Sequence, residues 1–381
     1  MFIYILWSTT YPLAGLVSPE WIFKIDPLVV FCVSLSERVI LPGFVFCLVM
    51  LALTVLLGRF FCGWICPLGT FNDGVSSFRK KKALVSGEAN RKIRKGKYLV
   101  LGAVAIAAVF GFQVAWIFDP LVIMARFVSL NLIPAVTLLI DRFFVTVIQQ
   151  FNGYGVFYDF YRFLKGSFLG VHVYYFSSAG IIFFFFLLIS LPVLFVSRIW
   201  CRMLCPLGAI YALTAKTACL ERKVGTCSDC GICRSSCRMG AIREDGSYEK
   251  GECILCMDCV YTCPLARTSF GWRTSAKEKK HHSPPSAGKI SRKDFLLLLG
   301  SSLLLTGFRN QRRRRAGGKK GVRSGLIRPP GSLSENAFMD RCIRCGNCMK
   351  VCPTNGLQPV MLESGPEGIW TPRLVPEIGY C

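Results

Sequence analysis

The cysteines of this 381-residue chain are the residues most able to do chemistry, because most of the 20 fall into tight, regularly spaced groups. Two adjacent runs share the spacing C-x2-C-x2-C-x3-C, the first over 227–237 and the second over 253–263. This is the doubled run of a bacterial ferredoxin, in which three cysteines wrap one cluster and the fourth reaches its partner. The runs therefore predict two [4Fe-4S] clusters.

The alternation of the two runs also predicts which cysteine binds which cluster. One cluster takes Cys227, Cys230, Cys233 and Cys263, and the other takes Cys253, Cys256, Cys259 and Cys237. Zinc would need two separate sets of four ligands, which this alternation does not provide. Arg238 follows Cys237 where proline is usual, and we expect its charge to raise the potential of the nearby cluster.

A third run near the C-terminus predicts at least one further [4Fe-4S] cluster. Its ligands would be Cys342, Cys345, Cys348 and Cys352, and only Cys381 follows them. Either Cys381 completes a single cluster, or the chain stops at the first cysteine of a second unit. We expect a truncated module, because a ligand at the last residue would have no supporting backbone around it.

A separate pattern, R-x-x-C-x-x-x-C-P-L-G, occurs twice, beginning at Arg59 and at Arg198. Each copy follows an apolar stretch and an Asp-Pro-Leu turn, so the two halves form an internal repeat. The candidate redox or metal residues of the repeat are Cys62, Cys66, Cys201 and Cys205. They could ligate one soft metal or cluster, form a redox-active dithiol, or simply pack. The turn residues Asp26 and Asp119 could accept quinol protons, although a helix-capping role is the simpler interpretation.

The elements that position these cysteines are expected to be membrane helices. Hydrophobic residues make up 52% of the chain and charged residues 18%, with a net charge of +24, which excludes disorder and argues against an ordinary soluble protein. The apolar stretches long enough to cross about 30 Å of hydrocarbon are Val39–Leu57, Tyr98–Phe118 and roughly Val171–Val196, with Met1–Val17 as a further span. The predicted fold class is a mainly α-helical polytopic membrane protein with about four transmembrane helices in two repeats, joined to small α+β bacterial-ferredoxin-like domains.

Charge asymmetry predicts the sidedness of the loops. Arg79–Lys97 carries a net +8 and Arg198–Lys293 a net +9, whereas Ser18–Arg38 and Asp119–Gly170 carry −1 and +1. The basic loops, and with them the ferredoxin domain at 221–272, are therefore expected on the cytoplasmic face of a bacterial inner membrane. Leu130–Ile140 is apolar, but Asp141 and Arg142 make a further complete crossing less favourable.

The C-terminal part gives conflicting signals. Ser291–Leu296 resembles a twin-arginine export signal placed internally and is followed by a short apolar run to Phe308. Export would make the third ferredoxin run periplasmic. Nine basic residues in Arg309–Arg328 resist translocation, so the alternative is a surface helix or hairpin with everything cytoplasmic.

These features predict a domain order along the chain. The segments are a first membrane repeat (1–78), a basic cytoplasmic loop (79–97), a second membrane repeat (98–220), a two-cluster ferredoxin domain (221–272), a linker (273–290), a Tat-like signal or short membrane helix (291–308), a basic linker (309–334) and a third ferredoxin motif (335–381).

The paired C-x-x-x-C-P motifs and the double ferredoxin module resemble the NapH/NosR/MauN group of membrane iron–sulfur proteins over roughly residues 1–270. Residues 291–381 resemble the ferredoxin-type partner NapG, as though two subunits were fused. The resemblance implies a quinol dehydrogenase component that feeds electrons to periplasmic reductases, or an electron donor in metalloenzyme maturation.

Two functions follow as hypotheses. In the first, the chain is an electron-transfer protein in the membrane lipid, and a quinol or cytoplasmic donor passes electrons through it to a periplasmic reductase or partner. In the second, it is an accessory or regulatory protein whose thiols handle copper or another metal, since soft sulfur ligands suit Cu(I). Bis-histidine haem is excluded within this chain, because His172 is the only intramembrane histidine candidate. Nucleic-acid binding by Arg312–Arg315 has no recognisable module to support it.

Overall fold

The computed structural model describes the chain apart from residues 10–17, 79–86, 152–154, 166–174, 226, 228–229, 274–325, 364 and 381. Contacts divide the chain into two compact units that interleave in sequence. One unit contains Lys24–Leu121 and Leu188–Gln311; the other contains Met1–Phe23, Val122–Leu187 and Arg312–Cys381. We call them the repeat unit and the C-terminal unit, and each is described by itself.

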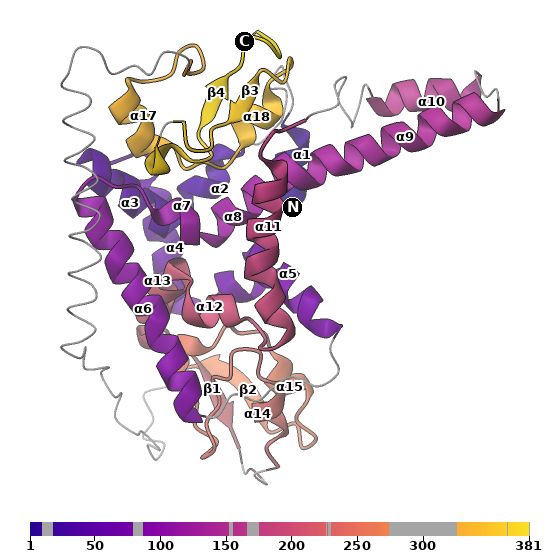
Figure 1. Ribbon diagram of the computed structural model, residues 1–381. Coiled ribbons are helices and arrows are strands. Elements are labelled where there is room, and N and C mark those ends of the chain that lie inside the picture. Colours follow the sequence, from indigo (N-terminus) through magenta and orange to yellow (C-terminus); the bar gives the residue numbers. More distant parts are fainter. Residues whose placement is uncertain are drawn as a thin grey trace. The chain divides into compact units, whose positions relative to one another are not determined.

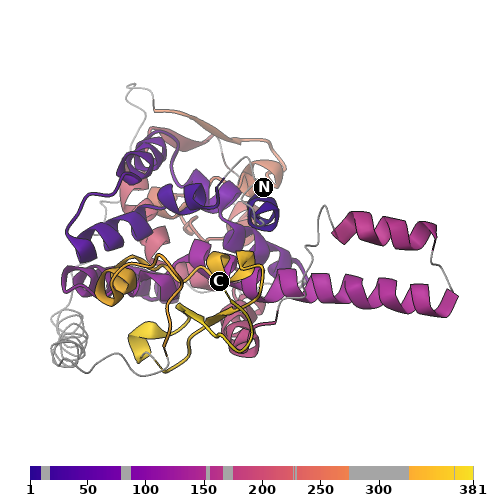
Figure 2. The ribbon, with the colours of Figure 1, turned by 90° about the horizontal axis from the view of Figure 1, so that it is seen from above.

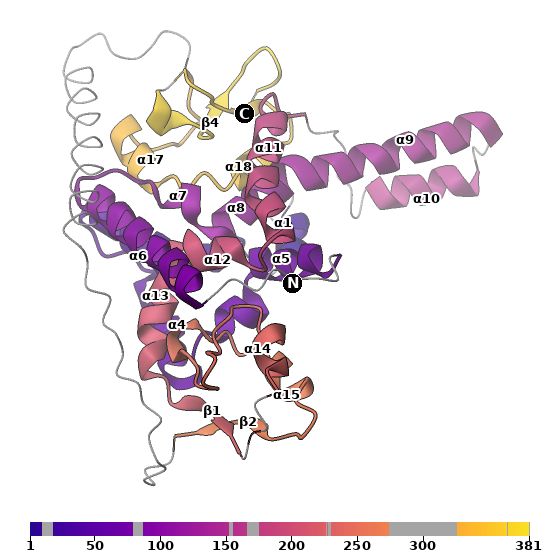
Figure 3. The ribbon, with the colours of Figure 1, turned by 60° about the horizontal axis from the view of Figure 1, so that its bottom comes forward.

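The repeat unit holds both C-x-x-x-C-P motifs and the double ferredoxin run. Figure 1 labels the α-helices and strands of this unit. Its elements are α3 (Pro27–Glu37), α4 (Phe44–Leu57), η1 (Phe61–Ile65), α5 (Pro67–Ser77), α6 (Gly87–Val109), α7 (Ala115–Phe118), η4 (Leu191–Leu194), α12 (Ile199–Met203), α13 (Pro206–Thr214), η5 (Ala215–Thr217), β1 (Leu220–Val224), α14 (Ile232–Ser236), η6 (Lys250–Glu252), α15 (Asp258–Tyr261) and β2 (Thr268–Trp272). The strands β1 and β2 pair antiparallel, with Arg222 opposite Phe270, and Figure 3 shows this ribbon beside α14 and α15. The ribbon closes the two ends of the ferredoxin segment onto each other.

The C-terminal unit contains most of a long apolar helix, Pro120–Gln150, which we call the rod, and the third ferredoxin run. Its elements are α1 (Phe2–Ser8), η2 (Val128–Leu132), α9 (Ile133–Phe151), α10 (Val156–Leu164), α11 (Ala179–Ser190, which continues into the repeat unit), α17 (Glu335–Arg341), α18 (Asn347–Val351), β3 (Leu357–Pro359), η7 (Pro366–Gly368) and β4 (Pro372–Leu374). Two short helices, α2 (Glu20–Lys24) and α8 (Pro120–Phe127), cross the boundary between the units in sequence. Figure 2 shows α9 and α10 lying side by side.

The expectation of about four transmembrane helices is wrong. In the described part of the chain, one helix is long and apolar enough to cross a membrane, the 31-residue rod Pro120–Gln150 formed by α8, η2 and α9. The other apolar helices in the described ranges, Pro27–Glu37, Phe44–Leu57 and Ala179–Leu194, are shorter. The polytopic fold class is therefore replaced by one candidate spanning helix, with ferredoxin domains as expected.

Backbone breaks explain why the apolar stretches do not become spans. In the first, Arg38 adopts a left-handed φ of 60° and α4 begins only at Phe44. Its 14 residues reach about 21 Å, against roughly 30 Å of hydrocarbon. In the second, α6 ends at Val109 and Gly111 turns the chain with φ 81°. In the third, Pro192 lies in a 3-10 turn that follows α11.

The candidate spanning helix lies where charge had argued against a crossing. Asp141 is buried on α9, but it accepts a hydrogen bond from the Tyr161 hydroxyl at 2.9 Å and pairs with Lys165 at 3.3 Å. Both partners come from α10 and its C-terminal cap. The acid is therefore neutralised within the helix pair, and it no longer marks a break in the apolar run.

Candidate functional site

Each repeated motif ends with its second cysteine capping a helix. Cys66 and Cys205 have extended backbones, and the following prolines start α5 and α13. The Cys205 sulfur accepts a hydrogen bond from the Gly208 amide at 3.2 Å. Both thiols are buried, and burial raises the pKa of each well above its usual range.

The two motif arginines cross over to the opposite repeat. Arg198 donates to the Cys62 carbonyl at 2.7 Å, and a Cβ on Gly69 would lie 3.4 Å from its guanidinium. Arg59 lies in the equivalent position, 3.1 Å from a Cβ built on Gly208. Both arginine side chains are almost completely buried. A guanidinium group from the other repeat therefore lies against each motif glycine and leaves little room for a side chain there.

Each buried arginine is also connected to a residue that is adjacent in sequence to a predicted cluster ligand. Arg59 contacts such a residue directly, and Arg198 is connected to one through the carboxylate of Asp73. Arg59 contacts Glu252 at 3.1 Å, and Glu252 directly precedes Cys253. Lys97 on α6 donates to both oxygens of Glu252 at 2.6 Å. Lys97 and Arg59 together outweigh the effect of burial and lower the pKa of Glu252. One carboxylate thus holds two buried cations next to a predicted ligand.

The second arginine reaches the other predicted ligand through Asp73 on α5. Arg198 donates to Asp73 with Nε at 2.7 Å, and Arg238 donates to the same carboxylate at 2.6 Å. Arg238 also makes a two-point contact with Asp258, at 2.5 and 2.9 Å. Arg238 follows Cys237, at the position where ferredoxins usually have proline. Its contact with Asp73 links the ferredoxin segment to α5.

The first cysteine of each motif packs against the predicted cluster site. Cys201 belongs to a buried cluster with Met239, Ala241 and Ile254, and Cys62, Cys237 and Cys256 pack against it. A Cβ on Gly63 would lie 2.2 Å from the Ile254 carbonyl, so only glycine permits this approach. Trp64 Nε1 donates to the Leu255 carbonyl at 2.9 Å. The first C-x-x-x-C-P motif, which contains Gly63 and Trp64, therefore contacts the loop between Cys253 and Cys256.

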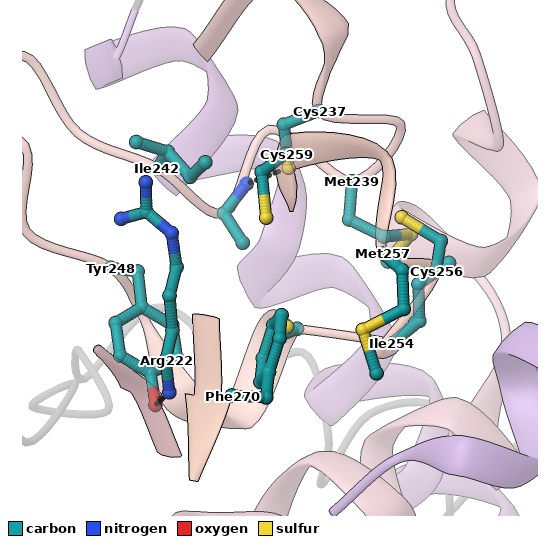
Figure 4. A pocket seen from close by; sticks show the side chains of 12 residues that line it. Arg222, Cys237, Met239, Ile242, Tyr248, Ile254, Cys256, Met257, Cys259 and Phe270 are labelled. Carbon is teal, nitrogen blue, oxygen red and sulfur yellow. Dashed lines mark hydrogen bonds between the residues drawn. The ribbon is translucent and has the colours of Figure 1, made fainter. Parts of the chain in front are cut away.

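One predicted ligand set lines a single pocket. Cys237, Cys253, Cys256 and Cys259 all border it, together with Met239, Ile254 and Phe270 (Figure 4). The Cys237 sulfur accepts a hydrogen bond from the Ala241 amide at 3.2 Å, a contact of the kind that tunes cluster potentials. Four sulfur donors in apolar walls fit a [4Fe-4S] cluster. Among the described residues, no three cysteine, histidine or acidic side chains converge on one metal ion.

The backbone of the three ferredoxin runs repeats the same unusual conformation. Left-handed φ angles occur just before or just after the second cysteine, at Gly231 in the first run, at Leu255 and Met257 in the second, and at Arg344 and Gly346 in the third. They recur three residues after the fourth cysteine, at Gly240, Ala266 and Asn355. Non-glycine residues rarely adopt this region, and such residues gather at functional sites. The shared conformation fits loops that wrap around a cluster.

The other predicted ligands are less closely gathered. Cys227 and Cys230 are exposed, and Cys233 and Cys263 are half-buried. Ser236 and Thr262, which precede the fourth cysteines of the two runs, have their hydroxyls 3.1 Å apart. The two fourth cysteines therefore lie on neighbouring segments. Cys381, His172 and the export-like segment 291–308 fall outside the described residues.

The third run lies against the apolar rod of the C-terminal unit. Arg126 donates to the Arg344 carbonyl at 2.9 Å, and a Cβ on Gly346 would lie 2.9 Å from Leu130. Lys350 donates to three carbonyls of the α1 end, those of Leu6, Trp7 and Thr9, at 2.6–2.9 Å. Cys352 is buried, Cys342 and Cys345 are half-buried, and Cys348 is exposed.

Sequence reasoning missed one pair of positions in the repeat. Asn72 and Tyr211 both lie six residues after the second cysteine, on α5 and α13, and both are fully buried. Neither side chain makes a polar hydrogen bond to a described residue. The shared offset from the cysteine is the signal that would have identified them.

Comparisons with known proteins agree with this geometry. A 4Fe-4S binding domain model matches residues 39–84 and again 178–227, one C-x-x-x-C-P motif each time. The NosR model matches residues 225–269, and a second 4Fe-4S binding domain model matches 338–358. The chain therefore carries 4Fe-4S domains similar to those of NosR/NapH-type ferredoxin proteins. It carries two or more [4Fe-4S] clusters.

Three relatives of the chain are named as an electron transport protein, a regulatory protein and a ferredoxin-type protein. The chain is 25% identical over 239 residues to "Putative electron transport protein YccM" of Escherichia coli K12, covering 60% of this chain and 56% of the relative. It is 40% identical over 72 residues to the regulatory protein NosR of Pseudomonas aeruginosa, covering 18% and 10%. Ferredoxin-type protein NapG of E. coli is 49% identical over 45 residues, covering 12% and 18%.

These matches support an iron–sulfur electron-transfer or NosR-like accessory role. The chain spans about half the length of YccM and a tenth of NosR, so whole-protein activities do not transfer from them. No solved structure matches the chain.

The Glu252 contact gives a first prediction. Glu252→Gln leaves Arg59 and Lys97 buried without their carboxylate, so we expect it to lower the free energy of unfolding by about 3–5 kcal/mol. Glu244→Gln is the control, because its pair with Arg234 is exposed and worth about 0–1 kcal/mol. Denaturant unfolding of both variants measures the difference. Equal losses would show that the buried contact does not hold the ferredoxin segment.

Proposed function

We propose that the chain takes electrons from a quinol or a cytoplasmic donor and passes them through its [4Fe-4S] clusters, beside which the motif cysteines lie, to a periplasmic reductase or redox partner. The observation that carries this proposal is the packing of Cys62 and Cys201 with Cys237 and Cys256. One cysteine from each repeat thereby lies in the same buried cluster as two predicted ligands. The clusters, when bound, supply one-electron carriers.

Apolar residues of the chain pack around the contact between the motif cysteines and the predicted ligands. Ile254, Met239 and Ala241 are buried and fill the space between the cysteines. Gly63 brings the motif backbone onto the cluster loop, and Trp64 fixes it there with a hydrogen bond. A donor that docks at the motif cysteines would therefore lie directly beside the predicted cluster site, with no further carrier between them.

The C-terminal unit supports attachment to lipid. The rod Pro120–Gln150 is long enough to cross a bilayer, and α9 and α10 expose large apolar side chains. Leu139, Phe143, Phe157 and Phe163 are each more than half exposed. Such a patch marks an interaction surface, and a membrane would cover it.

A second candidate function is NosR-like metalloenzyme maturation. The NosR model covers residues 225–269, and relatives include NosR and NirI proteins. Cys62, Cys66, Cys201 and Cys205 offer soft sulfur donors suited to Cu(I). In this fold they are buried or half-buried; burial raises the pKa of Cys66, Cys201 and Cys205, and the nearby Cys62 raises each of the three further.

The cluster ligands can be tested by pairing variants. If the runs alternate, Cys237→Ser and Cys256→Ser remove the same cluster, while Cys230→Ser and Cys263→Ser remove the other. We expect matching losses of EPR signal and about one cluster of iron within each pair. Cys219→Ser serves as the control, because Cys219 belongs to no run. A Cys237→Ser spectrum that matches Cys230→Ser would refute the alternation.

The donor is tested by anaerobic titration of the full chain with a reduced quinol. We expect the quinol to reduce the clusters in the unmodified chain, and the Cys62→Ser/Cys201→Ser double variant to be reduced by dithionite but not by quinol. If quinol reduces neither protein while Cu(I) binds tightly to the unmodified chain, the maturation function replaces electron transfer.

The contact itself is tested at Gly63. Gly63→Ala would place a Cβ 2.2 Å from the Ile254 carbonyl, so the motif must move away from the cluster loop, at about 1–3 kcal/mol of stability. We expect slower cluster reduction by quinol in stopped-flow measurements. Gly74→Ala on α5 is the matched control, since a Cβ there meets nothing within 4 Å. Equal rates in both variants would show that electrons do not pass at this contact.

A further inference from the structure

Two equivalent acids of the repeats meet inside the repeat unit. Asp26 and Asp119 each precede the proline that starts a helix, and both side chains are fully buried. They hydrogen-bond to each other. Asp26 also caps α3 by accepting from the Leu28 and Val29 amides at 2.8 and 3.4 Å. Two carboxyl groups in direct contact cannot both ionise, so the pair keeps one proton.

The surroundings of this pair favour holding protons. Burial raises the pKa of Asp26 to about 6, although its hydrogen bonds to Asp119 and to two amides act in the opposite direction. The titratable groups that interact with the pair are Cys32 on α3, Cys47 on α4 and Tyr211 on α13. None of the described groups that act on Asp26 is a cation.

The remaining neighbours of α3 do not change this balance. Helix α6 packs against α3, but its Arg94 and Lys97 contact Glu249 and Glu252 of the ferredoxin segment. Helix α7 has the sequence AWIF and carries no titratable side chain. The described groups that act on Asp26 therefore carry no positive charge.

Tyr211 connects the acid pair to the motif cysteines. Its ring lies 5.3 Å from that of Phe61, the neighbour of Cys62, and its buried hydroxyl makes no hydrogen bond to a described residue. Burial raises the pKa of Tyr211, and the charges of both aspartates and of Cys62 and Cys66 raise it further. The pKa of the phenol thus responds to the charges at both sites.

We propose that Asp26 and Asp119 share one proton and take up a second when the iron–sulfur centre beside Cys62 and Cys201 is reduced, with Tyr211 on the proton's route. This inference rests on the proposed electron-transfer function. One electron arriving from a quinol adds one negative charge, and one proton from that quinol or from solvent converts the half-protonated pair to two neutral carboxylic acids. In a low-dielectric interior, a buried charge at one site stabilises a proton at the other, and the coupling is reciprocal.

The pH window follows from the direction of the shift. Above pH of about 6 the oxidised pair is half-protonated, and reduction raises its affinity for the second proton. We therefore expect the cluster potential to fall as pH rises from about 6 to 8. EPR-monitored redox titration of the full chain with mediators measures this slope, and dithionite serves as the reductant.

The carboxyl groups can be observed directly. Reduced-minus-oxidised infrared spectra of the unmodified chain should show a new protonated-carboxyl band that shifts in D2O. We expect Asp26→Asn and Asp119→Asn each to abolish both this band and the pH slope. Asp245→Asn, at an exposed carboxylate of the ferredoxin segment, should keep both. Tyr211→Phe should keep the slope and slow proton uptake, as followed with a pH-indicating dye.

Several results would overturn the inference. A potential independent of pH in the unmodified chain does so without any variant, which covers the case in which the asparagine variants fail to fold. A slope and infrared band that survive in Asp26→Asn and Asp119→Asn also do so. Unchanged uptake in Tyr211→Phe removes Tyr211 from the route. If quinol does not reduce clusters that dithionite does reduce, the proposed function fails instead, and the pH slope still decides this inference.

Discussion

The architecture of the repeat unit depends on the burial of two guanidinium groups. Arg59 and Arg198 have almost no exposed side-chain surface, and removing a charge from water costs several kcal/mol unless an anion compensates. The compensating acids are Glu252, within the ferredoxin segment, and Asp73, which in turn contacts Arg238 of that segment. The ferredoxin segment must therefore lie on the repeats for Arg59 to be compensated, and it reaches Arg198 through the contact of Arg238 with Asp73.

The internal repeat explains why equivalent residues meet in pairs, and its asymmetry explains what each half contributes. Positions 63 and 202 correspond, as do 64 and 203. In the first repeat Gly63 makes room for the Ile254 carbonyl, and Trp64 donates to Leu255. In the second repeat Arg202 donates to the Met239 carbonyl at 3.0 Å. One repeat thus holds the loop between two predicted ligands, and the other holds the segment after Cys237.

The sequence was sufficient to predict the iron–sulfur clusters but not to predict the number of helices that could cross a membrane. Thiolate spacing is a local property, so the runs at 227–263 and 342–352 predict clusters from residue order alone. Apolar length is also local, but it counts residues and not backbone breaks, so the turns at Arg38 and Gly111 were not anticipated. Asp141 argued against a span only because its partner Lys165, 24 residues further on, could not be foreseen.

The same limit applies to Arg238, whose charge was expected to raise the potential of its neighbouring cluster. In the folded chain Arg238 and Arg198 are matched by Asp73 and Asp258, so these four side chains together carry no net charge. On the other side, Glu252 faces both Arg59 and Lys97, which leaves one positive charge in excess while both are protonated. Burial and Arg59 lower the pKa of Lys97 to about 8, so this excess is present at neutral pH and declines above it. Positive charge that favours the reduced cluster therefore comes from the motif arginine of the first repeat, from α6 and from Arg202, and the effect of Arg238 on the potential stays a prediction.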